Sequence, residues 1–157
     1  MSSTDDQHFR SDAFDHALFR SHGRTKVWVQ GRALRVDAWG PYNRELVDAQ
    51  FRLLRERAAP LLPADGLFYE LISYHDSLLM PEDAWTALAQ YVDASVGKGI
   101  CARQTIMVID PQTEGYRFFV DRIEKIWSRS RPLLRALSVA DGERELARLL
   151  DNHAGES

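Results

Sequence analysis

Hydrophobic and polar side chains alternate in the first ordered part of the chain. Residues 26–30 place Val27 and Val29 on one side, and residues 32–39 alternate in the same way, with Gly31 between the two runs. Such alternation is typical of half-buried strands, and a glycine between two of them favours a turn. The pattern therefore predicts an antiparallel hairpin.

Helical and strand-like segments take turns after this hairpin. Apolar residues recur every three or four positions in the predicted helices, whereas the predicted strands are short and nearly continuous apolar runs. The predicted helices cover residues 44–62, 81–99, 116–127 and 141–153, and the further strands cover residues 66–74, 103–110 and 133–139. This alternation predicts right-handed crossovers and a largely parallel sheet. We expect one α/β domain with a five-stranded mixed sheet, opened by the antiparallel hairpin, over residues 25–153.

An N-terminal arm, residues 1–24, precedes this domain. Residues 1–10 are polar and indicate a loose tail, whereas residues 11–23 favour a short helix in which Phe14 and Leu18 share a face. The arm carries more apolar area than a free tail should expose. We therefore expect it to dock, either on its own domain or across a homodimer.

Composition and charge are those of an ordinary globular domain. The chain has 157 residues, of which 45% are hydrophobic and 27% charged, and its net charge is −3. This charge gives no electrostatic case for a nucleic acid or an anionic membrane as partner. The N-terminus lacks the features of a signal peptide, and the single cysteine, Cys101, excludes an internal disulfide. The expected location is the cytoplasm.

No set of residues in the sequence resembles an active site or a metal centre. His75 and Asp76 are adjacent, so they rarely point at one atom, and no third ligand has a convincing spacing. Cys101 has no local signature of a nucleophile, and Arg129 and Arg131 are interpreted as parts of a solvated connector. The sequence therefore predicts a protein that is not an enzyme and that needs no metal or organic cofactor.

The order of these elements resembles that of the STAS domain, and specifically the SpoIIAA-like group of STAS-like proteins. Three local features of the sequence support this resemblance. The hairpin leads through "WGPYN" (39–43) into a helix, "LFYELISY" (67–74) leads into a helix with an early tryptophan, and "TIMVID" (105–110) precedes an aromatic-rich helix. The resemblance covers about residues 25–150. It implies a small cytoplasmic protein that works by binding.

Asp76 and Ser77 lie where this resemblance implies a chemical switch. Anti-sigma-factor antagonists of this fold carry a phosphorylatable serine at the start of the helix after the third strand, in an Asp-Ser-x-Gly-like stretch. Here residues 75–83 read "HDSLLMPED", no Ser-Gly follows, and the usual acceptor position falls nearer Leu79 or Met80. We therefore interpret Ser77 as a loop serine that bonds nearby backbone, whose replacement by alanine should change stability by less than about 1 kcal/mol, the usual scale for a surface change.

Two functions remain open at this point. The first is a non-enzymatic interaction or regulatory module that binds a protein partner or a second copy of itself. A mixed sheet face with Arg35, Asp37, Trp39 and Glu70 is expected to be only partly covered, since Glu70 interrupts an apolar run. The candidate interaction surface comprises Phe14, Leu18, Arg35, Asp37 and Trp39. The alternative is a module for a small molecule, an apolar ligand or a nucleotide, held by backbone N–H groups near residues 76–80.

Overall fold

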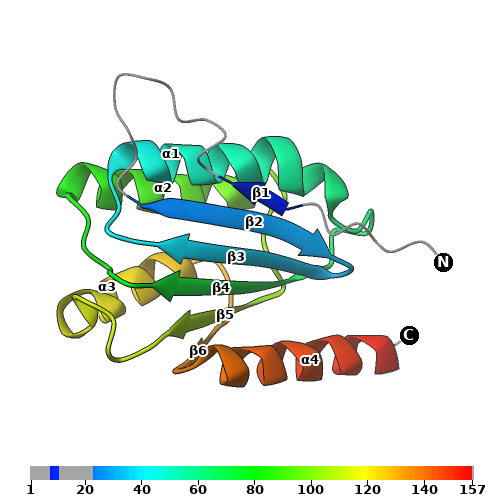
Figure 1. The fold of residues 1–157 in the computed structure, drawn as a ribbon. Helices are drawn as coiled ribbons and strands as arrows, with labels where there is room; N and C mark the ends of the chain where they lie inside the picture. The colour runs from blue at the N-terminus through cyan, green and yellow to red at the C-terminus, as the bar shows by residue number, and fades with distance from the viewer. Residues whose placement is uncertain (1–7, 11–22, 157) are drawn as a thin grey trace.

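Strand order in the sheet follows strand order in the chain (Figure 1). The computed structural model describes residues 8–10 and 23–156. The strands are β1 (His8–Arg10), β2 (Arg24–Gln30), β3 (Ala33–Trp39), β4 (Tyr69–His75), β5 (Gln104–Ile109) and β6 (Leu133–Ala136). The pairs β1–β2 and β2–β3 are antiparallel, and each later pair is parallel. The α/β class, the opening hairpin and the five predicted strands are thereby confirmed.

The short strand β1 was not expected. It lies within the segment predicted to be a loose tail, and it pairs with residues 26–28 of β2, so the described part of the chain forms a sheet of six strands rather than five. Phe9 is half-buried against the main core, which explains why this part of the tail adds to the sheet. Phe14 and Leu18, and the short helix predicted around them, lie outside the described residues.

Four α-helices are present in the described part of the chain. They are α1 (Arg44–Leu53), α2 (Glu82–Gly97), α3 (Tyr116–Ser128) and α4 (Val139–Gly155). Asn43 begins α1 by accepting a hydrogen bond from the Leu46 N–H at 2.9 Å, and Ser138 begins α4 in the same way. Because Ser138 caps a helix, β6 ends at Ala136 and not at 139 as predicted.

The predicted helix over residues 44–62 changes its winding near its end. After α1, the π-helical turn η2 (Leu54–Ala58) and the 3₁₀ turn η3 (Ala59–Leu61) follow. The Ala59 N–H bonds to the Leu54 carbonyl, five residues back, and Pro60 has no N–H with which to continue an α-helical ladder. Single π-helical turns occur frequently near functional sites.

The two faces of the sheet are covered unequally. Successive right-handed crossovers add strands in one direction, so α1, α2 and α3 all pack on the same face, here called the three-helix face. Helix α4 follows the last strand and packs on the opposite face, against β4, β5 and β6 (Figure 1). In the described part of the chain, no helix packs on β2 and β3 from the α4 side.

Each face has its own apolar core. The main core fills the space between the sheet and the three helices, and Leu46, Ile72, Trp85, Met107 and Ile123 are almost fully buried in it. The second core joins Leu71, Ile106 and Val108 of the sheet to Leu146 and Leu149 of α4. No helix in residues 8–10 and 23–156 has the length and apolarity that crossing a membrane requires.

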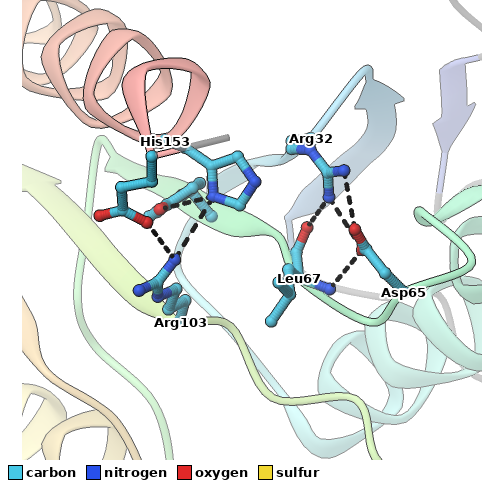
Figure 2. A network of polar contacts seen from close by, with 7 residues as sticks. Arg32, Asp65, Leu67, Arg103 and His153 are labelled. Carbon is cyan, nitrogen blue, oxygen red and sulfur yellow. Dashed lines mark hydrogen bonds and ion pairs between the residues drawn. The ribbon is translucent and has the colours of Figure 1, made fainter.

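Polar contacts fix the end of α4 at the amino edge of the sheet (Figure 2). The Tyr69 hydroxyl lies 3.1 Å from Nδ1 of His153, and Arg103 donates to Glu156 at 3.1 Å. Nearby, both terminal nitrogens of Arg32 donate to the Asp65 carboxylate at 2.8 Å, which lowers the pKa of Asp65 to about 2. These contacts hold in place the loops that lead into the parallel strands.

Candidate functional site

Ser77 lies in the turn that follows β4, and its hydroxyl is engaged inside the protein. Its Oγ donates to Oε1 of Glu114 at 2.8 Å and accepts from the Leu79 N–H at 3.1 Å. Ser77 is only 3% exposed, and Asp76 before it adopts a left-handed backbone with φ of 69°. The prediction of a loop serine that bonds nearby backbone is confirmed by the Leu79 N–H. The surface position assumed for it is wrong, because the loop carrying Glu114 packs over it.

The backbone around Ser77 is also occupied. The Ser77 N–H donates to the His75 carbonyl, the Leu78 N–H donates to the Glu114 carbonyl, and the Leu79 N–H donates to Ser77 Oγ. These three groups were expected to be free to bind a ligand at residues 76–80. The prediction that these three N–H groups bind a ligand at the start of the second helix is therefore wrong.

Ser77→Ala is expected to lower the free energy of unfolding by about 1–2 kcal/mol, more than a surface change would. The substitution removes the donor to Glu114 and leaves the Leu79 N–H without its acceptor. Urea unfolding of the variant measures the loss. Ser128→Ala, at an exposed position of α3, is the control and should stay within about 0.5 kcal/mol of the wild type. A loss below 0.5 kcal/mol for Ser77→Ala would contradict its internal role.

On the side of the sheet opposite the three-helix face, the part that α4 does not cover carries polar and aromatic side chains. We call it the β2–β3 surface, and it consists of Arg24, Lys26, Trp28, Arg35, Asp37 and Trp39. The register of β2 and β3 places these side chains on one side of the sheet, with Asp37 opposite Lys26 and Arg35 opposite Trp28. Arg35, Asp37 and Trp39 share one face, as their alternation predicts.

His75 joins the β2–β3 surface from the neighbouring strand. Its Nε2 lies 2.9 Å from Oδ1 of Asp37, and its ring stacks on Trp39 with 5.1 Å between ring centroids. The guanidinium of Arg24 lies 4.3 Å from the centre of the Trp39 ring. Sequence proximity suggested Asp76 as the neighbour of His75, whereas the parallel register of β3 and β4 supplies Asp37 instead.

Basic side chains also lie over the ring of a second tryptophan, Trp28. Lys26 lies 4.8 Å and Arg35 lies 5.3 Å from the centre of the Trp28 ring. Arg35 also forms an ion pair with Glu143 of α4, so the edge of the helix meets this surface. The indole faces thus hold basic side chains in place, which is the geometry of cation–π attraction.

Glu70 does not belong to this surface. The register of β3 and β4 pairs it with Leu34, on the three-helix face, and its exposure is 2%. The expectation that Glu70 meets water or a partner beside Arg35, Asp37 and Trp39 is therefore wrong. Its position in an apolar run marks a buried charge and not an exposed face.

The partner of Glu70 is Arg131, which the sequence placed in a solvated connector. Both side chains are 3% exposed, and Nη1 of Arg131 lies 3.3 Å from Oε1 of Glu70. The Thr105 hydroxyl donates to the same oxygen at 2.7 Å. The solvated interpretation of Arg131 is wrong, because the connector folds inward over the amino ends of β4 and β5.

Glu70 and Arg131 line a small cavity, here called the inner cavity. It lies on the three-helix face, between the amino ends of the strands, the turn η2 and the end of α2, and its volume is about 40 Å³. Its apolar walls are formed by Leu34, Phe51, Leu54, Phe68, Ile100 and Trp127. A glutamate inside an apolar strand was the only sequence signal for this cavity, and nothing local linked it to Arg131.

Comparison of the chain with protein-family models, with curated proteins and with solved structures finds no match. Among residues 8–10 and 23–156, no group of three or more histidine, cysteine, aspartate or glutamate side chains is placed to hold a metal ion. The β2–β3 surface and the inner cavity both offer chemistry for binding, the first through cations and indole rings and the second through Glu70 and Arg131.

Proposed function

We propose that this chain is a non-enzymatic STAS-like interaction module of the cytoplasm that binds an acidic segment of a partner protein through the β2–β3 surface. The observation that carries the proposal is the unequal covering of the sheet. Helix α4 packs on β4, β5 and β6, while β2 and β3 present basic and aromatic side chains on the same face.

The charge of the β2–β3 surface favours a negatively charged partner. The chain as a whole has a net charge of −3, yet this surface carries Arg24, Lys26 and Arg35 against Asp37 and against Glu143 of α4, which is paired with Arg35. Asp37 in turn is bound by His75. Complementary charge raises the rate of association and fixes the orientation of a partner, so a local excess of cations selects for acidic segments.

The aromatic side chains supply the apolar contact area. Trp28 and Trp39 are half-buried, and a shallow hollow of about 220 Å³ lies between Arg24, Lys26 and Trp39. Tryptophan and arginine are enriched among the residues that contribute most to protein interfaces. The surface therefore combines steering by charge with indole rings that a partner can cover.

The element order supports the STAS-like part of the proposal. An antiparallel hairpin followed by strand–helix repeats is the order on which the resemblance to the SpoIIAA-like group rests. The buried hydroxyl of Ser77 lies against Glu114, so a phosphate there would place more negative charge beside a carboxylate. We therefore propose binding that does not depend on phosphorylation of Ser77.

The test compares three baits in extracts of the native host. The wild-type chain and an Arg148→Glu variant, altered on exposed α4, should retain the same acidic protein. A variant with Arg24→Glu and Lys26→Glu should retain at least about tenfold less, since each lost charge contact contributes roughly 1 kcal/mol. Raising the salt concentration should release the protein from the wild-type bait.

Two outcomes would contradict the proposal. One is equal retention by the wild type and the doubly charge-reversed variant. The other is that no bait retains a partner and that the wild type and the doubly charge-reversed variant both sediment as the same dimer. Thermal melting of all three baits checks that they are equally folded.

A further inference from the structure

The inner cavity lies on the three-helix face, on the other side of the sheet from the β2–β3 surface. Its floor is polar although almost no water reaches it. Arg131 donates from Nε and Nη2 to Ser130 Oγ and from Nη1 to Glu70. In the described part of the chain, one N–H on each terminal nitrogen of Arg131 and the second oxygen of Glu70 therefore keep hydrogen-bonding capacity.

A group that fits this floor must donate and accept hydrogen bonds at once. It has to accept from Arg131 and donate to Glu70, as a hydroxyl group does. A cavity of about 40 Å³ has room for roughly two or three water-sized groups. The cavity therefore suits the polar head of a ligand, while the rest of that ligand lies in the opening above.

The walls above the floor favour a flat ring. Phe51 is stacked on Tyr91 with 4.9 Å between ring centroids and an interplanar angle of 9°. Phe51 and Trp127 lie 6.3 Å apart at 20°, so the rings of these three residues are nearly parallel. The guanidinium of Arg131 already lies 5.1 Å from the centre of the Trp127 ring, so a planar ligand meets the edges of this array in the opening above the floor.

The mouth of the cavity adds positive charge. Arg55 of the π-helical turn η2 and Lys98 after α2 both line it and are exposed. With Arg131 the lining holds three cations against the carboxylate of Glu70. An anionic group at the outer end of a ligand would lie among these cations, and a neutral or cationic end would gain nothing there.

We infer that the inner cavity binds a small hydroxy-aromatic carboxylate. The hydroxyl group lies between Glu70 and Arg131, the ring lies in the opening above the floor against the edges of Phe51 and Trp127, and the carboxylate lies near Lys98. This site is separate from the β2–β3 surface, so its failure or success does not decide the proposed interaction with a protein.

The experiment follows the tryptophan side-chain N–H signals by ¹H–¹⁵N NMR during titration. Trp127 lines the cavity and donates to the Tyr74 hydroxyl at 2.9 Å, whereas Trp28, Trp39 and Trp85 do not line it and serve as internal controls. The probes are 4-hydroxyphenylacetate, phenylacetate without the hydroxyl, and the neutral amide 4-hydroxyphenylacetamide. We expect 4-hydroxyphenylacetate to shift Trp127 saturably and each analogue to bind about tenfold more weakly.

Three variants test the mouth of the cavity without altering the fold. Lys98→Glu should weaken 4-hydroxyphenylacetate about tenfold and leave the amide unchanged, since only the anion contacts Lys98. Arg148→Glu, the same charge change on exposed α4, should alter neither. Ala94→Trp, at an exposed lining position of α2, should abolish the Trp127 shift for every probe without lowering the melting temperature.

Three results would overturn the inference. The first is a Trp127 signal that no probe shifts up to its solubility limit. The second is equal affinity for all three probes, because that would remove the roles of the hydroxyl and the carboxylate. The third is a shift of Trp28 or Trp39 in place of Trp127, which would move the binding to the other face.

Discussion

Arg131→Met is expected to lower the free energy of unfolding by about 3–5 kcal/mol. The substitution keeps much of the side-chain volume but leaves the carboxylate of Glu70 buried without its counter-charge. Only the Thr105 hydroxyl then remains to satisfy that carboxylate in the described part of the chain. Urea unfolding at neutral pH measures the loss. The unfolding free energies of wild type and variant are compared where both depend equally steeply on the urea concentration.

The control is the double variant Glu70→Leu with Arg131→Met, which removes both charges together. Replacing a buried ion pair by apolar groups is often close to neutral, so the double variant should recover most of the stability that Arg131→Met loses. The coupling between the two sites then exceeds about 1 kcal/mol. If the double variant instead loses as much stability as Glu70→Leu and Arg131→Met lose together, the two residues act independently, against the geometry described above.

Gly142→Leu is expected to cost about 3 kcal/mol, because α4 lies on the sheet at this residue. A Cβ atom at position 142 would lie 2.4 Å from Cγ2 of Val108 and 3.2 Å from Cδ1 of Leu71. A leucine there would lift the helix from the second core. The loss should appear in thermal melting and as faster amide exchange along α4.

The matched control is Gly97→Leu in α2, where no atom lies within 4 Å of the added Cβ. Its stability should be unchanged or slightly raised, since leucine favours a helix by up to about 1 kcal/mol over glycine. Gly142→Ala combined with Val108→Ala should lose less than the two single losses added together, because Val108→Ala removes the clashing methyl group. A Gly142→Leu variant as stable as the wild type would mean that α4 is not held by close approach.

Periodicity in the sequence predicts most elements of this fold. The apolar run of β5 and the helical spacing in α3 are local patterns, and the structure has both elements within a residue or two of the predicted ends. The end of β6 was misplaced because Ser138 was not recognised as a helix cap. β1 was missed because a three-residue strand has too few positions to show alternation.

The binding features could not be predicted in the same way, because each joins residues that are far apart in the chain. Ser77 meets Glu114 across 37 residues, and Glu70 meets Arg131 across 61. Strand register and loop packing create these pairs, and neither is visible in a local window. A polar residue in an apolar strand, such as Glu70, indicates that a partner exists but not which residue it is.

The strictly sequential strand order also bears on how the chain folds. Within residues 8–10 and 23–156, every strand pairs only with the strands next to it in the sequence, and each parallel pairing closes one strand–helix–strand unit. Each strand can therefore pair with one that is already in place. Parallel partners such as Ala33 and Tyr69 are nevertheless far apart in the chain, so more loop-closure entropy is lost before native contacts form than in a helical bundle of this length. We therefore expect the hairpin of β2 and β3 to act as a template on which β4, β5 and β6 assemble in turn, with α4 docking last.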